Sequence, residues 1–195
     1  MVTPRSCKPQ RWCRTRKGAR ADETRYDLAR NRARGLLTLT KQRPPVDVQV
    51  IIDLAGIPVV ERALPDGTRA TIGDVAGRRS IILNRKWKFS SENERRWVLA
   101  EELGHVLMGH RLVESTEPGK PAIGLLEPRR HFYEREARAF AAELLMPFAE
   151  VRRRWFGLSR DGVSVEDMVR RLADEFAVTT SAMRVRLEQM KVIQA

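Results

Sequence analysis

The stretch of this 195-residue chain that is most informative about the fold reads Trp97-Val-Leu-Ala-Glu101-Glu102-Leu-Gly-His105-Val-Leu-Met-Gly-His110. Its residues are good helix formers with an apolar stripe, and the preceding Ser91-Glu-Asn-Glu94 has the pattern of a capping box. Residues four apart share one face of a helix, so Glu101 and His105 can both point at one ion. Glu102 lies about 100° further round the helix, beside such an ion rather than on it.

This spacing is that of the His-Glu-x-x-His zinc helix, in which the first and fifth residues bind the metal and the glutamate activates water. Glu101 stands where that pattern has its first histidine. Taken alone, this helix is equally consistent with a site that binds no metal. In that case Glu101 and Glu102 lie on an exposed charged face and His105 is a hydrogen-bonded core residue. His110 follows His105 by five positions, about 140° round the helix, and is therefore expected on the surface or next to a ligand, not as a ligand.

A second helical stretch reads Tyr133-Glu-Arg-Glu136-Ala-Arg-Ala-Phe140-Ala-Ala-Glu-Leu-Leu-Met146-Pro147. Glu136 lies on an otherwise small and apolar face, where a carboxylate is costly to bury unless it is paired or bound to a metal. It is the expected third ligand. Glu143 shares this face but is expected to be exposed, Glu134 is expected to be solvated, and His131 is offset from Glu136 as His110 is from His105.

The two stretches together resemble the ImmA/IrrE family of zinc metallopeptidases. The usual pattern of that family is Ala-His-Glu-Leu-Gly-His followed by Glu-Ala-x-x-Phe-Ala-Ala-x-Leu-Leu-Met-Pro. This chain reads Ala100-Glu-Glu-Leu-Gly-His105 and then Glu136-Ala-Arg-Ala-Phe-Ala-Ala-Glu-Leu-Leu-Met-Pro147. The upstream Pro45-Val-Asp-Val and Leu64-Pro-Asp-Gly67 also look like the family, and the resemblance covers roughly residues 25 to 156.

The resemblance implies a zinc-dependent endopeptidase in which His105 is the second zinc ligand, Glu136 the third and Glu102 the general base. In that role Glu102 takes a proton from the attacking water and passes it to the leaving amine. The implied substrate is a protein, a helix-turn-helix transcriptional repressor. The family has histidine at position 101, so no role is carried over to Glu101.

Glu101 changes the expected chemistry of the site. A carboxylate can bind zinc, so a site of Glu101, His105 and Glu136 is physically feasible. Two carboxylates neutralise the ion, which then acidifies water less, and an oxygen-rich site favours harder ions such as Mn²⁺. Three outcomes stay open: a slow or substrate-restricted peptidase, a metal-free and inactive relative that binds the repressor, and a site rescued by another ligand.

The patterns predict an α+β fold, in which a small antiparallel sheet packs on the two metal-site helices, and a C-terminal helix-turn-helix-like pair follows. Three divisions of the chain are expected: a basic disordered tail (1–21), a metallopeptidase-like domain (22–157) and a helical extension (158–195). The predicted helices and strands are a surface helix Asp22–Gln42, a short helix ending at Leu54, strands Ile57–Leu64, Thr68–Val75 and Arg79–Asn84, and long helices Ser91–His110 and Pro128–Met146.

Much of the formal net charge of +12 lies near the N-terminus, where residues 1–35 hold eleven Lys or Arg and three Asp or Glu. Such a tail can be simply solvated or can contact nucleic acid through unspecific attraction. In the C-terminal helices, Arg184 and Arg186 can meet phosphates if the pair binds DNA, although packing is the default. The residues expected to form the core of this pair are Leu172, Ala173, Phe176, Val178, Met183, Val185 and Leu187.

The two cysteines, Cys7 and Cys13, have no neighbouring Cys or His pair that would complete a zinc knuckle. We expect a cytoplasmic protein, because no apolar run reaches eighteen residues and the basic N-terminus has no apolar segment of the secretory kind. A membrane partner is not expected.

Overall fold

The computed structural model describes residues 19–113, 123–125, 129–159 and 162–194. Within these residues it has seven α-helices and a three-stranded sheet, so the predicted α+β class is confirmed. The helices and strands are α1 (Ala19–Thr40), α2 (Val48–Leu54), β1 (Val59–Arg62), β2 (Ala70–Val75), β3 (Arg78–Asn84), α3 (Glu92–Leu107), α4 (Arg130–Leu145), α5 (Phe148–Leu158), α6 (Val165–Phe176) and α7 (Thr180–Gln189).

The sheet has the strand order β1-β3-β2. Residues 80–84 of β3 are all buried, which explains why this apolar strand takes the centre. β2 pairs with β3 antiparallel through the turn at Ala76-Gly77, whereas β1 pairs with β3 parallel. The sheet is therefore mixed and not wholly antiparallel as predicted, because the chain crosses from β1 to the far edge before the hairpin returns it to the centre.

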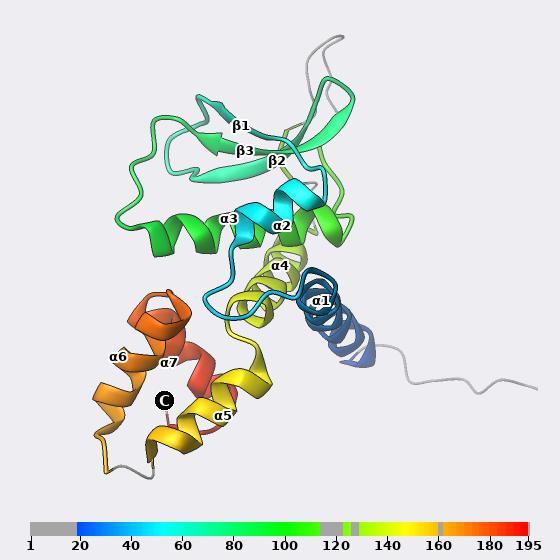
Figure 1. The fold of residues 1–195 in the computed structure, drawn as a ribbon. Coiled ribbons are helices and arrows are strands. Elements are labelled where there is room, and N and C mark those ends of the chain that lie inside the picture. The colour runs from blue at the N-terminus through cyan, green and yellow to red at the C-terminus, as the bar shows by residue number, and fades with distance from the viewer. Residues whose placement is uncertain (1–18, 114–122, 126–128, 160–161, 195) are drawn as a thin grey trace, which may run out of the picture.

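The molecule is layered around α3 (Figure 1). One side of α3 lies along the sheet, α4 packs against its other side, and α1 lies beside α4. The core runs through all these layers and includes Ile81 from the sheet, Leu103 from α3 and Phe140 from α4. Two helices far apart in the sequence, α1 and α4, are thereby neighbours.

The helix α1 begins at Ala19, within the predicted tail, and residues 1–18 lie outside the described residues. It was predicted as a surface helix, and it buries Ala29 and Ala33 completely. These two positions are four apart and form the narrow face that contacts α4. The helix is thus part of the core that supports α4.

The helices α6 and α7 form the predicted C-terminal pair, with Ser164 and Thr179 as their N-caps and Ala177 in the left-handed region between them. Six of the seven expected core residues are buried, namely Leu172, Ala173, Phe176, Val178, Met183 and Leu187. The seventh, Val185, is exposed. Arg186, one of the two arginines that could meet a phosphate, is buried, so this pair offers less positive charge than its sequence suggests.

Candidate functional site

The helix α3 carries the predicted site. It begins at the N-cap Ser91, whose Oγ accepts a hydrogen bond from the Glu94 backbone N–H at 3.1 Å. Its fourth turn lacks a side chain at Gly104, where a Cβ would lie only 3.0 Å from Cδ1 of Phe140 on α4. Because glycine allows this close approach, side chains of α4 reach those of α3 next to His105.

A pocket of about 670 Å³ lies where the start of β2 meets α3 and α4. Three carboxylates line it, from Glu101 and Glu102 on α3 and from Glu134 on α4. The other residues that line it are Gly67, Thr68, Arg69, Ala70, Val98, Arg130, His131, Arg135 and Arg138. Acidic side chains therefore gather at one point of a basic protein, with arginines around them.

His105 and Glu134 face each other in this region, with 3.7 Å between His105 Nε2 and Glu134 Oε2. The His105 side chain is only 3% exposed and that of Glu134 is 33% exposed, so the expectation of a solvated Glu134 is wrong. Hydrogen bonding to His105 is the main reason why the pKa of Glu134 lies below its ordinary value. Two ligands bound to one tetrahedral zinc ion at 2.0–2.2 Å would lie roughly 3.4 Å apart, close to the separation seen here.

Glu136, the predicted third ligand, has other partners. The Arg25 guanidinium of α1 donates through Nε at 2.6 Å and through a terminal nitrogen at 2.7 Å, one to each carboxylate oxygen. His110 Nε2 lies 3.0 Å from Glu136 Oε2. Burial opposes ionisation of Glu136, but these hydrogen bonds outweigh it and hold its pKa below the ordinary value. The carboxylate is therefore a buried anion neutralised by an arginine.

His110 stands between the two predicted ligands, because its Nδ1 is 2.9 Å from His105 Nδ1. Burial lowers the pKa of His110 to about 4, so its ring is neutral near pH 7. An ionised Glu136 accepts only, so His110 carries its proton on Nε2 and accepts at Nδ1 from His105 Nδ1–H. His105 Nε2 is then the ring nitrogen that faces Glu134 and is left to bind a metal. His110 thus contacts a candidate ligand without being one, as its helical offset predicts.

Glu101 shares the face of His105 but is drawn toward arginines. Its carboxylate lies 3.5 Å from Arg138 Nε and 4.0 Å from a terminal nitrogen of Arg69, and Trp97 also donates a hydrogen bond to it. Burial raises the pKa of Glu101 despite these contacts. The ion pairs are long, so they hold the carboxylate loosely.

These residues fit a metal ion in donor type, and two of them converge on one point. No three His, Cys, Asp or Glu side chains of the described residues are grouped closely enough to hold an ion. His105 and Glu134 are close enough to bind one ion together, whereas the Glu101 carboxylate points toward Arg69 and Arg138. The three predicted ligands Glu101, His105 and Glu136 thus do not surround a common point in this arrangement, and whether they bind metal stays a prediction.

Glu102 is the predicted general base and lies in the same pocket. Burial, helped by the negative charges of Glu101 and Glu134, raises the pKa of Glu102 to about 8. A carboxyl group surrounded by other carboxylates favours a nearby cation, which would let it ionise. A raised pKa of this kind, in a pocket, is typical of an acid–base residue.

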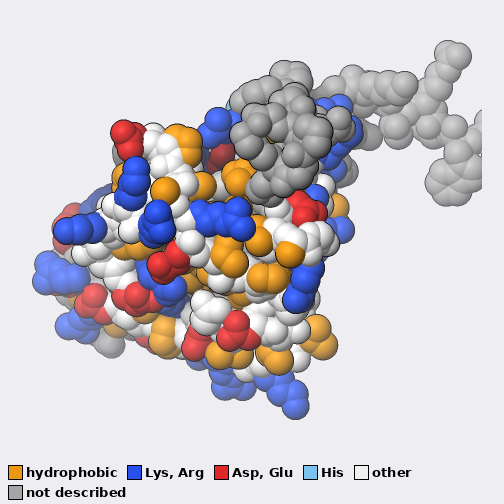
Figure 2. Space-filling view, turned by 90° about the horizontal axis from the view of Figure 1, so that it is seen from above, with side chains coloured by type: hydrophobic (Ala, Val, Ile, Leu, Met, Phe, Trp, Pro, Cys, Tyr) orange, Lys and Arg blue, Asp and Glu red, His pale blue; other side chains and the backbone are white. Residues whose placement is uncertain are grey.

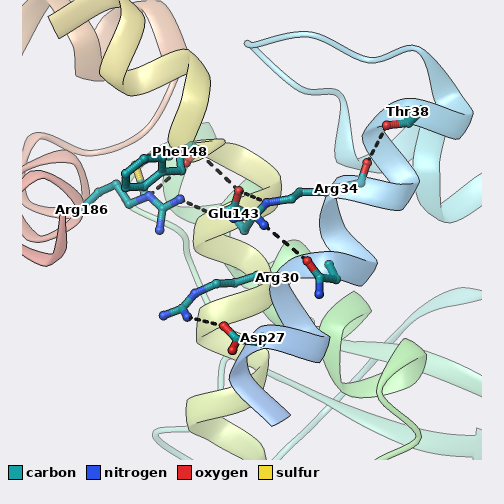
Figure 3. Close-up of polar contacts among 9 residues, drawn as sticks. Asp27, Arg30, Arg34, Thr38, Glu143, Phe148 and Arg186 are labelled. Carbon is teal, nitrogen blue, oxygen red and sulfur yellow. Dashed lines mark hydrogen bonds and ion pairs between the residues drawn. The ribbon is translucent and has the colours of Figure 1, made fainter. Parts of the chain in front are cut away.

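Behind this site, Glu143 was expected to be exposed but is buried (Figure 3). It lies between Arg34 of α1 and Arg186 of α7 and accepts a hydrogen bond from the Phe148 backbone N–H. Arg186 also donates to the Met146 carbonyl at 3.0 Å. The buried carboxylate thus ties α1, α4 and α7 together and accounts for the burial of Arg186.

Sequence reasoning missed Glu134, Arg25, Arg69 and Arg138. Glu134 and Arg138 do carry one local signal, because residues four apart share a helix face. No local pattern indicates that this face, and not that of Glu136, meets the pocket. The outcome depends on how α4 crosses α3.

A zinc-helix spacing on α3, a facing histidine and carboxylate, and a carboxylate of raised pKa define a metallopeptidase-like protein. The family model described as the IrrE N-terminal-like domain, peptidase M78, matches residues 52–188, and the chain belongs to that family. A comparison with curated protein sequences found no match. Among the helices of the described residues, none combines the length and apolarity needed to cross a bilayer.

Proposed function

We propose that the protein is a metal-dependent endopeptidase that cleaves a helix-turn-helix repressor in the cytoplasm. The observation that carries the proposal is the 3.7 Å approach of His105 Nε2 to Glu134 Oε2, because the Glu134 carboxylate lines the same open pocket as Glu102. We assign the metal to His105 and Glu134, with Glu101 as third ligand after a side-chain rotation. Glu134 replaces Glu136 in this role because Arg25 and His110 occupy the oxygens of Glu136.

A bound zinc or manganese ion would supply Lewis acidity toward the scissile carbonyl and the attacking water. Glu102 would take the proton of that water on a carboxylate oxygen and deliver it to the leaving nitrogen. Ala70, the first residue of the edge strand β2, lines the same pocket. Residues 123–124 pair with β2 further along, at Ile72 and Gly73, so an extended substrate can add to the edge only at its Ala70 end, next to Glu102. The repressor as substrate rests on the family resemblance.

A second candidate function is repressor binding without catalysis. It is favoured by Glu101, which two arginines draw away from His105. In that case the pocket would hold the partner protein and Glu102 would have no proton to transfer. The two functions differ in whether the purified protein retains stoichiometric metal.

The test combines metal content with a search for cleaved proteins in cells. We expect the wild-type protein to bind about one zinc or manganese ion per chain, and Glu134→Gln to lose it while Glu136→Gln keeps it. New protein N-termini that appear with the wild type and not with Glu102→Gln should map to helix-turn-helix repressors. No metal and no new N-termini in the wild type, with both gained in Glu101→His, would establish the non-catalytic alternative.

A further inference from the structure

A second pocket, of about 610 Å³, lies between α1, α4 and α7 next to the candidate site. Its apolar lining includes Trp97 of α3, Ala139 and Met146 of α4 and Val185 of α7. The Val185 side chain is an exposed hydrophobic residue, with 49% of its surface accessible. A groove with such a floor can take up apolar side chains of a partner.

The rim of this groove is positively charged. Arg30 and Arg135 line it, and Arg30 also pairs with the exposed Asp27 at 3.2 Å. The Arg135 guanidinium lies 5.1 Å from the centre of the Tyr26 ring. Within the described part of the chain, no carboxylate forms an ion pair with Arg135, and the buried Tyr26 hydroxyl has no hydrogen-bond partner. The exposed Arg135 guanidinium can therefore receive a carboxylate from outside, whereas the Tyr26 hydroxyl is closed off from solvent.

The groove and the carboxylate pocket adjoin each other. Arg135 and Arg138 line both of them. In addition, Trp97 and Arg138 contact the Glu101 carboxylate from the side of the groove. A chain that passes Glu102 therefore has a direct path over these arginines toward α7.

Because the two pockets adjoin and the rim of the groove is positively charged, we propose that the groove binds an acidic, amphipathic segment of the substrate next to the scissile bond. Apolar side chains of this segment lie on Trp97 and Val185, and its carboxylates pair with Arg135 and Arg30. The inference rests on the proposed function, because a cleaved protein gives the groove its occupant. It gives α7 a role in substrate recognition.

Nucleic acid is the competing occupant, since it also carries negative charge. It is disfavoured because the floor is apolar and because Arg186, the inner arginine of α7, is buried against Glu143. Figure 2 shows the sheet side of the molecule, away from the groove, and on this face Lys and Arg side chains lie dispersed among acidic and hydrophobic ones and do not form one continuous patch. Duplex DNA is bound by surfaces of concentrated positive charge.

The test measures fluorescence anisotropy of two short labelled peptides that share leucines at helical spacing and carry either glutamates or lysines between them. The protein is the full chain with Glu102→Gln, so cleavage does not disturb binding. Arg135→Glu and Val185→Asp alter the groove. Arg170→Glu on α6 is the matched control, because Arg170 is an exposed arginine outside both pockets.

We expect the acidic peptide to bind and the basic one not to bind. Arg135→Glu and Val185→Asp should each weaken binding of the acidic peptide about tenfold, while Arg170→Glu changes it less than twofold. Equal binding of both peptides, or equal losses in Arg135→Glu and Arg170→Glu, overturns the proposal. Binding of a labelled DNA duplex that Arg135→Glu abolishes also overturns it. Absence of any cleavage with this binding pattern intact would contradict the peptidase function alone.

Discussion

Arg25 neutralises the buried Glu136 from a helix that lies before the family-matched residues. Its two hydrogen bonds, at 2.6 and 2.7 Å, reach from α1 to α4 across 111 positions of sequence. We predict that Arg25→Met, which keeps much of the aliphatic stem and removes the charge, destabilises the metal-free protein. The reason is that the Glu136 carboxylate, 5% exposed, keeps only His110 as a partner.

The magnitude follows from burial. Removing one partner of a fully buried ion pair costs about 3–5 kcal/mol, whereas an exposed pair contributes about 0–1 kcal/mol. The Arg25 side chain is 47% exposed and Glu136 is not, so the pair lies between these limits. We expect a loss of about 2 kcal/mol in the free energy of unfolding, or roughly 4–8 °C in Tm for a chain of this length.

The assay is urea unfolding followed by far-ultraviolet circular dichroism in EDTA. Arg30→Met is the matched control, because Arg30 lies on the same helix and pairs with the exposed Asp27 at 3.2 Å (Figure 3). The control should lose less than about 1 kcal/mol. In the double variant Arg25→Met/Glu136→Gln the anion is gone, so we expect part of the stability to return.

Equal losses in Arg25→Met and Arg30→Met would refute the reasoning, because the burial of Glu136 would then have no effect. A double variant less stable than Arg25→Met would also contradict it. The same samples test the orientation of His105. With Glu136 in place, ¹⁵N NMR of the metal-free protein should show His105 protonated on Nδ1 and His110 on Nε2.

Three further predictions concern stability. Gly104→Ala should cost about 1–3 kcal/mol in urea unfolding, because the new Cβ meets the Phe140 ring at 3.0 Å and backbone at 3.3 Å; an unchanged midpoint would contradict the close contact of α3 and α4. The free energy of unfolding of the metal-free protein should fall by about 3 kcal/mol as pH drops from 6.5 to 4. Over this range His110 takes up a proton in the unfolded chain but largely stays neutral in the folded protein, where its pKa is about 4. His110→Gln should flatten this part of the pH profile. Arg186→Met should cost about 3–5 kcal/mol in thermal or urea unfolding by leaving buried Glu143 with fewer partners, and a double replacement with Glu143→Gln should cost less than the single one.

Local sequence was sufficient for the helices and for the presence of a site. The cap at Ser91, the four-residue spacing of Glu101 and His105, and the apolar face around Phe140 depend only on backbone periodicity and neighbouring residues. These features predicted α3 and α4 within a few residues. They also pointed to the family to which the chain belongs.

The sheet shows where local patterns stop. The three strands were predicted near their observed positions, but their order and the parallel pairing of β1 with β3 were not. The sequence of a strand predicts which of its side chains face the core. The strand with which it pairs depends on the path of the connecting segments.

The carboxylate site was decided by tertiary structure. The chain has Glu134 and Glu136 two positions apart on one helix, and both are suitable ligands by residue type. Gly104 brings α4 against α3 so that Glu134 faces His105, while Glu136 faces His110 and Arg25. A sequence sets which groups can bind a metal, but their direction depends on the rotation of one packed helix against another, and contacts far apart in the chain fix that rotation.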